Sequence, residues 1–188
     1  MASRVSGPLV LVTPVARNTS ELEAEVVTLF DQFRRPLLRY LIGIGLPSHD
    51  AEEIVQETFL ALFQHLRDSK PRDNLRGWLF RVAHNLGLKR RQLSRRDWEG
   101  RADPEIADWA PDPAPSPETQ AVYRQDRRRL IAVANALAEQ DRRCLFLRAE
   151  GLRYREIAGI LGMSLGAVSM SLARTLARLA RATDRSLL

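Results

Sequence analysis

Hydrophobic residues recur at helical spacing through most of the chain, and this pattern predicts helices rather than strands. The clearest stretch is "DAEEIVQETFLALFQHLRD" at residues 50–68. An earlier amphipathic helix is predicted from about Glu21 to Leu41, where Pro36 is positioned to kink or break it. A later one is predicted from about Asn74 to Arg95. The apolar stripe of the middle helix comprises Ala51, Ile54, Val55, Thr58, Phe59, Leu62, Phe63 and Leu66, and that of the later helix comprises Leu75, Leu79, Val82, Ala83, Leu86 and Leu93.

A second helical block follows a long interruption. Its pattern predicts helices at about 118–138 and 141–150, then the short stretch "RYREIAGIL" and a last helix that opens near Leu165. Asp141 and Ser164 are suited to cap helices, and Gly151 and Gly162 to end them. A tight turn between two short helices is the outline of a helix-turn-helix, whose second helix enters the major groove of DNA.

The last predicted helix has an unusual composition for a DNA-reading element. From Gly162 to Ala173 it carries no charged residue. Phosphate neutralisation usually supplies much of the affinity of a protein for DNA. A helix of this kind must therefore work together with contacts made elsewhere.

The interruption, residues 97–120, contains five prolines and lacks a helical apolar period, so we expect an extended or disordered linker. The apolar patch "PLVLVTPVA" near the N-terminus holds two prolines and follows a single Arg, which favours a loosely attached arm over a secretory signal. The predicted fold is all-α. It has a disordered arm at 1–20, a small helical bundle at 21–96, the linker at 97–120, and a four-helix helix-turn-helix domain at 121–188.

The net charge of +6 is divided unevenly along the chain. Residues 1–96 carry +5, residues 97–120 carry −6, and residues 121–188 carry +7. Two basic domains that flank an acidic linker favour a polyanionic partner, most simply nucleic acid. The single cysteine, Cys144, fits a reducing cytoplasm and is expected to be a small buried residue.

Two faces of the first block are candidates for binding. The back of the helix at 50–67 carries Glu53, Gln56, Glu57, Leu60 and Gln64, which is either a solvated face or a protein-docking face with Leu60 as its anchor. The helix at 74–95 presents a basic and polar face that is suited to nucleic acid. Its Trp78 is either half-buried core or a platform on which an unpaired base stacks.

Catalytic and metal-binding patterns are lacking in the sequence. His49, His65 and His84 are scattered and are expected on the surface, and no Cys/His set has zinc spacing. No phosphate-binding glycine loop is present. We therefore expect a protein that is not an enzyme, needs no cofactor or metal, has no small-molecule substrate and does not insert into a membrane.

Three stretches in order, "DAEEIVQETFLALF", "LRGWLFRVAHNLGLKRR" and "REIAGILGMSLGAVSMSLAR", resemble the extracytoplasmic-function sigma factors of the bacterial sigma-70 family. The similarity covers roughly residues 29–182. It implies a subunit that binds core RNA polymerase and directs initiation at chosen promoters, with an anti-sigma factor as a further partner. It also implies that the acidic linker passes through the polymerase channels, where its charge mimics nucleic acid.

The resemblance implies three binding surfaces. Core polymerase is expected at Asp50, Glu53, Gln56, Glu57 and Leu60. The −10 promoter element is expected at Lys70, Arg72, Asn74, Trp78, Arg81, Asn85, Lys89, Arg90 and Gln92. The −35 element is expected at Arg153, Arg155, Ser164, Ala167, Ser169, Met170, Ser171 and Arg174.

The sequence departs from the family pattern in both DNA-binding segments. Lys89 stands where the family commonly has Asp, and "GAVSMS" stands where it commonly reads like "GTVKSR". The alternatives are a stand-alone helix-turn-helix regulator, which has no need of the basic and aromatic helix at 74–95, and a pure interaction module, which the two basic blocks disfavour.

Overall fold

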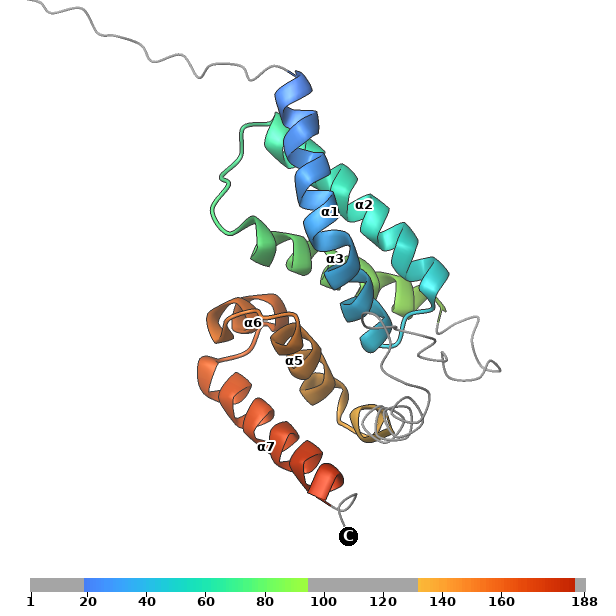
Figure 1. The fold of residues 1–188 in the computed structure, drawn as a ribbon, viewed down its shortest axis with the longest axis vertical. Helices are drawn as coiled ribbons and strands as arrows, with labels where there is room; N and C mark the ends of the chain where they lie inside the picture. The colour runs from blue at the N-terminus through green and yellow to red at the C-terminus, as the bar shows by residue number, and fades with distance from the viewer. Residues whose placement is uncertain (1–18, 95–131, 185–188) are drawn as a thin grey trace, which may run out of the picture.

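The computed structural model describes residues 19–94 and 132–184, and its regular elements within these ranges are all α-helices (Figure 1). They form two groups. The first bundle contains α1 (Thr19–Gly43), α2 (Ser48–Arg67) and α3 (Leu75–Ser94). The second bundle contains α5 (Glu139–Ala149), α6 (Tyr154–Leu161) and α7 (Leu165–Asp184). The predicted all-α fold is confirmed, whereas the linker at 97–120 and most of the N-terminal arm lie outside the described residues.

The apolar stripe of α2 packs into the first bundle as predicted. Its seven buried residues all belong to the predicted stripe, and only Phe63 of that stripe stays partly exposed. Helix α1 continues through Pro36 and ends at Gly43, and Gly45 takes a positive φ of 97° in the turn that follows. Thr19 and Ser20, which were assigned to the arm, already belong to α1.

Helix α3 departs from its predicted stripe in three places. Phe80 is fully buried against Tyr40, with ring centroids 5.8 Å apart, although it was not assigned to the core. His84 is 3% exposed, so the prediction that it lies on the surface is wrong. Leu93 was assigned to the core and is instead 57% exposed. A period of 3.6 residues identifies the apolar face of a helix. It does not show how far along that helix the neighbouring helices extend.

In the second bundle the predicted glycines end two helices, and the predicted serine caps the last one. Gly151 and Gly162 have φ values of 81° and 65°, the left-handed conformation that glycine adopts without strain. The Ser164 hydroxyl accepts a hydrogen bond from the Ala167 N–H at 3.1 Å, as expected of a residue that caps α7. Cys144 is fully buried, as predicted. The predicted helix at 118–138 lies mostly outside the described residues, apart from a short helical segment at 132–135.

The prediction for the start of α5 is wrong. This helix begins at Glu139 after Ala138, and no side chain caps its first turn. Asp141 lies inside the helix, where it pairs with α7. The two bundles also touch, because α5 packs on α1 and α6 packs on α3.

No single helix among the described residues is long and apolar enough to cross a membrane. The pair α6 and α7 meets the length and composition test only when taken together, across a bend of 106°.

Candidate functional site

The outer face of α2 holds the residues predicted to bind core polymerase. Gln56 and Glu57 are exposed, and Leu60 is 58% exposed, a large fraction for a leucine. Asp50 and Glu53 are partly buried at the side of this face. The five residues therefore share one helix surface, in which an exposed apolar side chain is bordered by acids.

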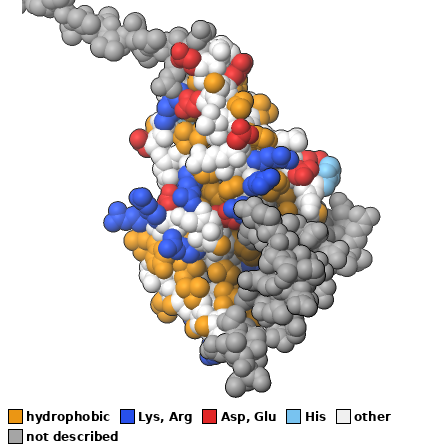
Figure 2. Space-filling view, in the orientation of Figure 1, with side chains coloured by type: hydrophobic (Ala, Val, Ile, Leu, Met, Phe, Trp, Pro, Cys, Tyr) orange, Lys and Arg blue, Asp and Glu red, His pale blue; other side chains and the backbone are white. Residues whose placement is uncertain are grey.

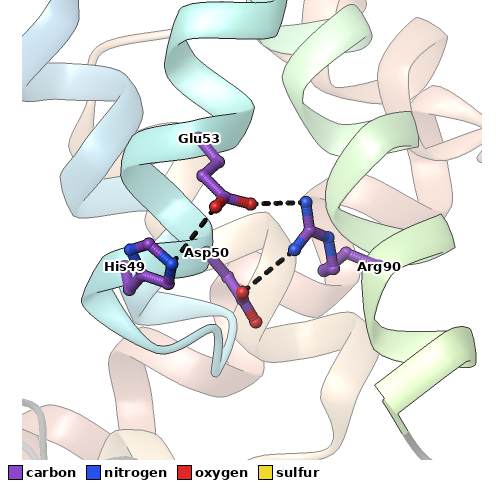
Figure 3. Close-up of polar contacts among 4 residues, drawn as sticks. All are labelled: His49, Asp50, Glu53 and Arg90. Carbon is purple, nitrogen blue, oxygen red and sulfur yellow. Dashed lines mark hydrogen bonds and ion pairs between the residues drawn. The ribbon is translucent and has the colours of Figure 1, made fainter.

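Arg90 of α3 fixes the two acids at the edge of that face (Figure 3). Its Nη1 lies 3.1 Å from Asp50 Oδ1 and its Nη2 lies 2.7 Å from Glu53 Oε2. The hydrogen bond to Glu53 is the main cause of the raised pKa of Arg90, and Asp50 adds to it. His49 Nε2 also lies 3.1 Å from Glu53 Oε1. Arg90 was predicted to contact −10 DNA, yet the structure directs its guanidinium toward α2.

The remaining polar face of α3 is open. Arg81, Asn85, Lys89 and Gln92 are all exposed and recur at helical spacing, so they form one surface. Trp78 begins this surface and is partly buried against the core. Its ring also lies 4.6 Å from that of His65, at an angle of 41°. Trp78 is therefore half-buried, as expected of a core residue, and it is also partly exposed, as stacking on an unpaired base requires.

The loop before α3 is held by local contacts. Lys70 Nζ lies 3.2 Å from Asp68 Oδ2, and Arg72 is ion-paired with Glu25 of α1. Asn74 has a φ of 56°, and its Oδ1 accepts a hydrogen bond of 3.0 Å from the Gly77 N–H in the first turn of α3. These predicted DNA-binding side chains are therefore positioned by the protein itself.

The role of His84 was not predicted from the sequence. Its Nδ1 lies 2.6 Å from the Tyr40 hydroxyl in the core between α1 and α3. Burial, reinforced by the nearby Arg143 charge, lowers the pKa of His84 to about 4. Burial likewise raises the pKa of Tyr40. The pair is a neutral core contact that helps to fix the helix behind the polar face.

Helices α6 and α7 form the predicted helix-turn-helix, with a change of direction of 106° across the turn at Gly162. Ser164, Ser169 and Met170 are exposed, and Ala167 is partly buried. At the start of α6, Arg153 and Arg155 are exposed. The two arginines thus lie at the start of α6, and the other four residues lie just before α7 or in its first two turns.

One predicted −35 contact is corrected by the structure. Ser171 is 1% exposed, and its hydroxyl donates a 2.6 Å hydrogen bond to Asp141 Oδ1 in α5. Arg174 Nη2 reaches the same oxygen at 3.2 Å from the surface. Ser171 therefore faces the core and joins α7 to α5, which leaves Ser169 and Met170 as the exposed side chains in this turn.

Among residues 19–94 and 132–184, no three His, Cys, Asp or Glu side chains converge as the ligands of a metal ion would.

Comparisons with known proteins agree with this geometry. Residues 29–99 match the family model for sigma-70 region 2, and residues 127–179 match that for sigma-70 region 4. The chain is 32% identical over 151 residues to the RNA polymerase sigma factor CnrH of Cupriavidus metallidurans, covering 76% of this chain and 78% of CnrH. It is also 32% identical over 154 residues to the sigma factor NccH of Alcaligenes xylosoxydans xylosoxydans, covering 80% and 82% of the two chains.

Another relative is longer than the matched region. The ECF RNA polymerase sigma factor SigE of Mycolicibacterium smegmatis is 34% identical over 124 residues, which cover 64% of this chain and 47% of SigE.

Two solved structures share the fold. A structure of CnrH in complex with the cytosolic domain of CnrY aligns with a TM-score of 0.61 and 24% identity, over 89% of this chain and 95% of that one. The sigma factor RpoE in complex with the anti-sigma factor NepR from Bartonella quintana aligns with a TM-score of 0.64 and 22% identity, over 88% and 98%. The chain belongs to the sigma-70 family and is an extracytoplasmic-function sigma factor, which binds core RNA polymerase and directs initiation at specific promoters.

Proposed function

We propose that the two bundles divide the work of promoter selection. Residues 21–96 dock on core polymerase and read the melted −10 element, and residues 121–188 read the −35 element. The observation that carries this division is the pair of separate faces on the first bundle. The outer face of α2 is acidic with an exposed Leu60, and the open face of α3 is basic and polar.

Docking on polymerase uses a fixed set of acids around an apolar anchor. Because Arg90 holds Asp50 and Glu53, these carboxylates lose little conformational freedom on binding. Glu57 and Gln56 remain exposed beside them. Leu60 supplies apolar area that becomes buried against the partner, which is the arrangement typical of an interface anchor.

Reading of the −10 element uses the open face of α3. Arg81 and Lys89 neutralise phosphates, while Asn85 and Gln92 hydrogen-bond to exposed base edges. Trp78 stacks on a flipped or unpaired base through its exposed part, with the His65 ring behind it. A single strand suits this surface because unpaired bases present both an aromatic face and free polar edges.

Reading of the −35 element relies on few contacts. Ser169 bonds to base edges or phosphates and Met170 packs on thymine methyl groups, while Arg153, Arg155 and Arg174 contribute charge around them. Once the first bundle is docked, the second meets DNA at a high effective concentration, so weak contacts suffice to select a sequence. The second bundle by itself is then a poor DNA binder.

An anti-sigma factor is the further partner. One of the two solved relatives, RpoE of Bartonella quintana, is bound to the anti-sigma factor NepR. In this chain α7 exposes Leu165, Met170 and Leu176 at 47%, 63% and 55%. In Figure 2 hydrophobic side chains spread widely over the second half of the molecule. We propose that an apolar helical segment of the anti-sigma factor covers α7 and blocks its access to DNA.

The free-regulator alternative is not favoured, since the chain matches the family models for both sigma-70 region 2 and sigma-70 region 4. The proposed role requires no catalytic step by this chain, because the polymerase forms the phosphodiester bonds. It places the protein in the cytoplasm, on the nucleoid when it is part of the holoenzyme.

The test is transcription in vitro with core polymerase on a pool of genomic promoters. The protein should produce discrete, sigma-dependent start sites. Leu60→Ala should weaken core binding by about tenfold without loss of stability, since it removes an exposed anchor. Val27→Ala is the matched control, because Val27 on α1 is also 58% exposed. Equal effects of the two substitutions would refute the assignment of the docking face.

A further inference from the structure

The loop that joins α2 to α3, residues 68–74, contains two backbone conformations that residues with a side chain seldom adopt. Ser69 has a φ of 55° and Asn74 has a φ of 56°, and within residues 19–94 and 132–184 no other non-glycine residue has a positive φ. The left-handed region is unfavourable for serine, whereas asparagine tolerates it better. In Figure 1 the loop runs along the outside of the first bundle. A loop in this position keeps such conformations when contacts outside its own backbone stabilise them.

Both ends of the loop are held by residues nearby in the sequence. At its start the Ser69 N–H donates to the carbonyl oxygen of Leu66 at 3.1 Å. At its end the carbonyl oxygen of Asn74 accepts a hydrogen bond of 3.0 Å from the Trp78 N–H. These bonds fix the two ends, so the middle of the loop depends on partners from the rest of the bundle.

His65 of α2 supplies such a partner. Its Nε2 lies 2.8 Å from the backbone carbonyl oxygen of Pro71. A carbonyl oxygen can only accept a hydrogen bond, so Nε2 carries the hydrogen and donates it. Arg72, the next residue of the loop, is ion-paired with Glu25 of α1. The middle of the loop is therefore attached to α2 through its backbone and to α1 through a side chain.

The same imidazole ring packs on Trp78. The two ring centroids are 4.6 Å apart, and the ring planes meet at 41°. Both side chains are partly buried, so Trp78 keeps some of its surface open beside this contact. An aromatic ring that is already fixed loses less conformational freedom when a base stacks on it. One side chain, His65, thus contacts both the loop and the tryptophan proposed to stack on a base.

We propose that His65 is a positioning residue for recognition of the −10 element. Its N–H fixes the middle of the loop and its ring fixes Trp78. The single strand therefore meets the loop side chains, among them Lys70 and Asn74, and the indole in one preformed arrangement. The inference rests on the proposed reading of the −10 element by the α3 face. It gives a role to a histidine that was expected to be an ordinary surface residue.

Two substitutions separate the two contacts of His65. His65→Phe keeps an aromatic ring beside Trp78 and removes the hydrogen-bond donor. His65→Gln removes the ring and keeps an N–H donor, because the amide nitrogen of glutamine is as many bonds from Cα as Nε2 of histidine is. Gln32→Ala is the control, since Gln32 is exposed on α1 and lies outside the proposed binding faces. Circular dichroism checks that each variant is folded, and titration with core polymerase checks that docking is unchanged.

The contact with the loop is measured as selectivity for the −10 sequence. The holoenzyme transcribes a pool of promoters randomised at this element, and sequencing compares transcripts from preferred sequences with the mean of the pool. We expect His65→Phe to lower this ratio about three- to tenfold, because the loop side chains are then free to move. His65→Gln should stay within about twofold of the parent, since the loop is held and stacking on Trp78 tolerates any base. Gln32→Ala should match the parent.

The contact with Trp78 is measured by fluorescence. Trp98→Phe and Trp109→Phe leave Trp78 as the only tryptophan of the chain. Time-resolved anisotropy of the free protein then reports the motion of this indole. We expect the fast component of the decay to grow in His65→Gln, which lacks the neighbouring ring, and to stay unchanged in His65→Phe.

The outcomes distinguish the role of His65 from the proposed function. Parental selectivity in folded His65→Phe would overturn the inference, and so would an equal loss in His65→Phe and His65→Gln. If His65→Phe does not fold, His65→Leu, which removes both contacts, takes its place in the comparison. Trp78→Ala is assayed in parallel, and −10 recognition that is unaffected by this substitution would count against the proposed role of the α3 face. A defect in Trp78→Ala combined with parental behaviour of His65→Phe would remove only the role of His65.

Discussion

Arg90 Nη2 lies 2.7 Å from Glu53 Oε2, and this ion pair joins the helix that bears the proposed docking acids to the helix that bears the proposed −10 face. Both partners are partly exposed, so the pair adds little to the stability of the fold. The role of Arg90 is to position side chains, because its guanidinium orients the carboxylates of both Asp50 and Glu53 on α2.

Replacing Arg90 with Ala should therefore act on core binding rather than on DNA. Without the guanidinium, Asp50 and Glu53 become free to move and repel each other, and we expect affinity for core polymerase to fall by about three- to tenfold. The measurement is fluorescence titration of the labelled protein with core polymerase. Lys89→Ala, one position earlier and exposed, is the control. Unchanged core affinity combined with weaker open-complex formation would return Arg90 to the DNA-binding face.

The stability of the first bundle should depend on pH through His84. Its folded pKa of about 4 lies below the ordinary value of 6.5, so the unfolded chain binds more protons between these two values. The contribution is complete above pH 6.5, declines as the pH falls, and is lost at about pH 4, with a total of about 3 kcal/mol at most.

Urea unfolding of the parent chain, His84→Gln and His49→Gln between pH 7 and pH 4 measures this effect. The extra loss of unfolding free energy at low pH should be absent from His84→Gln. It should persist in His49→Gln, because His49 has an 82% exposed side chain. An identical pH dependence in all three proteins would contradict the assignment to His84.

Ser171 should affect stability and leave promoter choice unchanged. Ser171→Ala removes a buried hydrogen bond to Asp141, and we expect a loss of about 1–2 kcal/mol in unfolding free energy. Ser169→Ala, at an exposed position of the same helix, should cost little stability and alter the preferred −35 sequence. Chemical unfolding and sequencing of start sites from a randomised promoter pool separate the two effects. A shift in sequence preference caused by Ser171→Ala would restore it to the DNA-contacting set.

Two glycines near the turn form a matched pair. Neither Gly162 nor Gly166 has an atom within 4 Å of the place where a Cβ would lie, so space does not decide the outcome. Gly162 has a φ of 65°, and we expect Gly162→Ala to cost about 1 kcal/mol. Gly166 lies in the first turn of α7, and Gly166→Ala should gain a few tenths of a kcal/mol. Thermal unfolding of both variants checks the opposite signs.

The helices and most of the core could be predicted from spacing alone, because each apolar stripe is a local property of its own segment. The stripe of α2 and the glycines that end α5 and α6 are examples. The surfaces were harder to predict. His84 and Ser171 have polar side chains whose partners, Tyr40 and Asp141, lie on other helices, so their burial depends on how helices cross.

Arg90 shows the same limit at the candidate site. A run of basic residues at the end of α3 does not reveal which of them turns toward the acids of α2, 37 and 40 residues earlier in the chain. Exposure of Leu60, in contrast, followed directly from its place opposite the apolar stripe. The faces of single helices were accessible to sequence reasoning, and the pairing of side chains between helices was not.

The uncharged side chains exposed in the first turns of α7 have a consequence for how promoters are ranked. The proposed contacts of Ser169 and Met170 with base pairs would displace no counterions, whereas the proposed contacts of the surrounding arginines with phosphates would. Changes in ionic strength should therefore raise or lower the occupancy of all promoters together, while the order of preference set by the −35 sequence stays constant. A cell that takes up salt under osmotic stress would keep the same set of target genes and change only the strength of their expression.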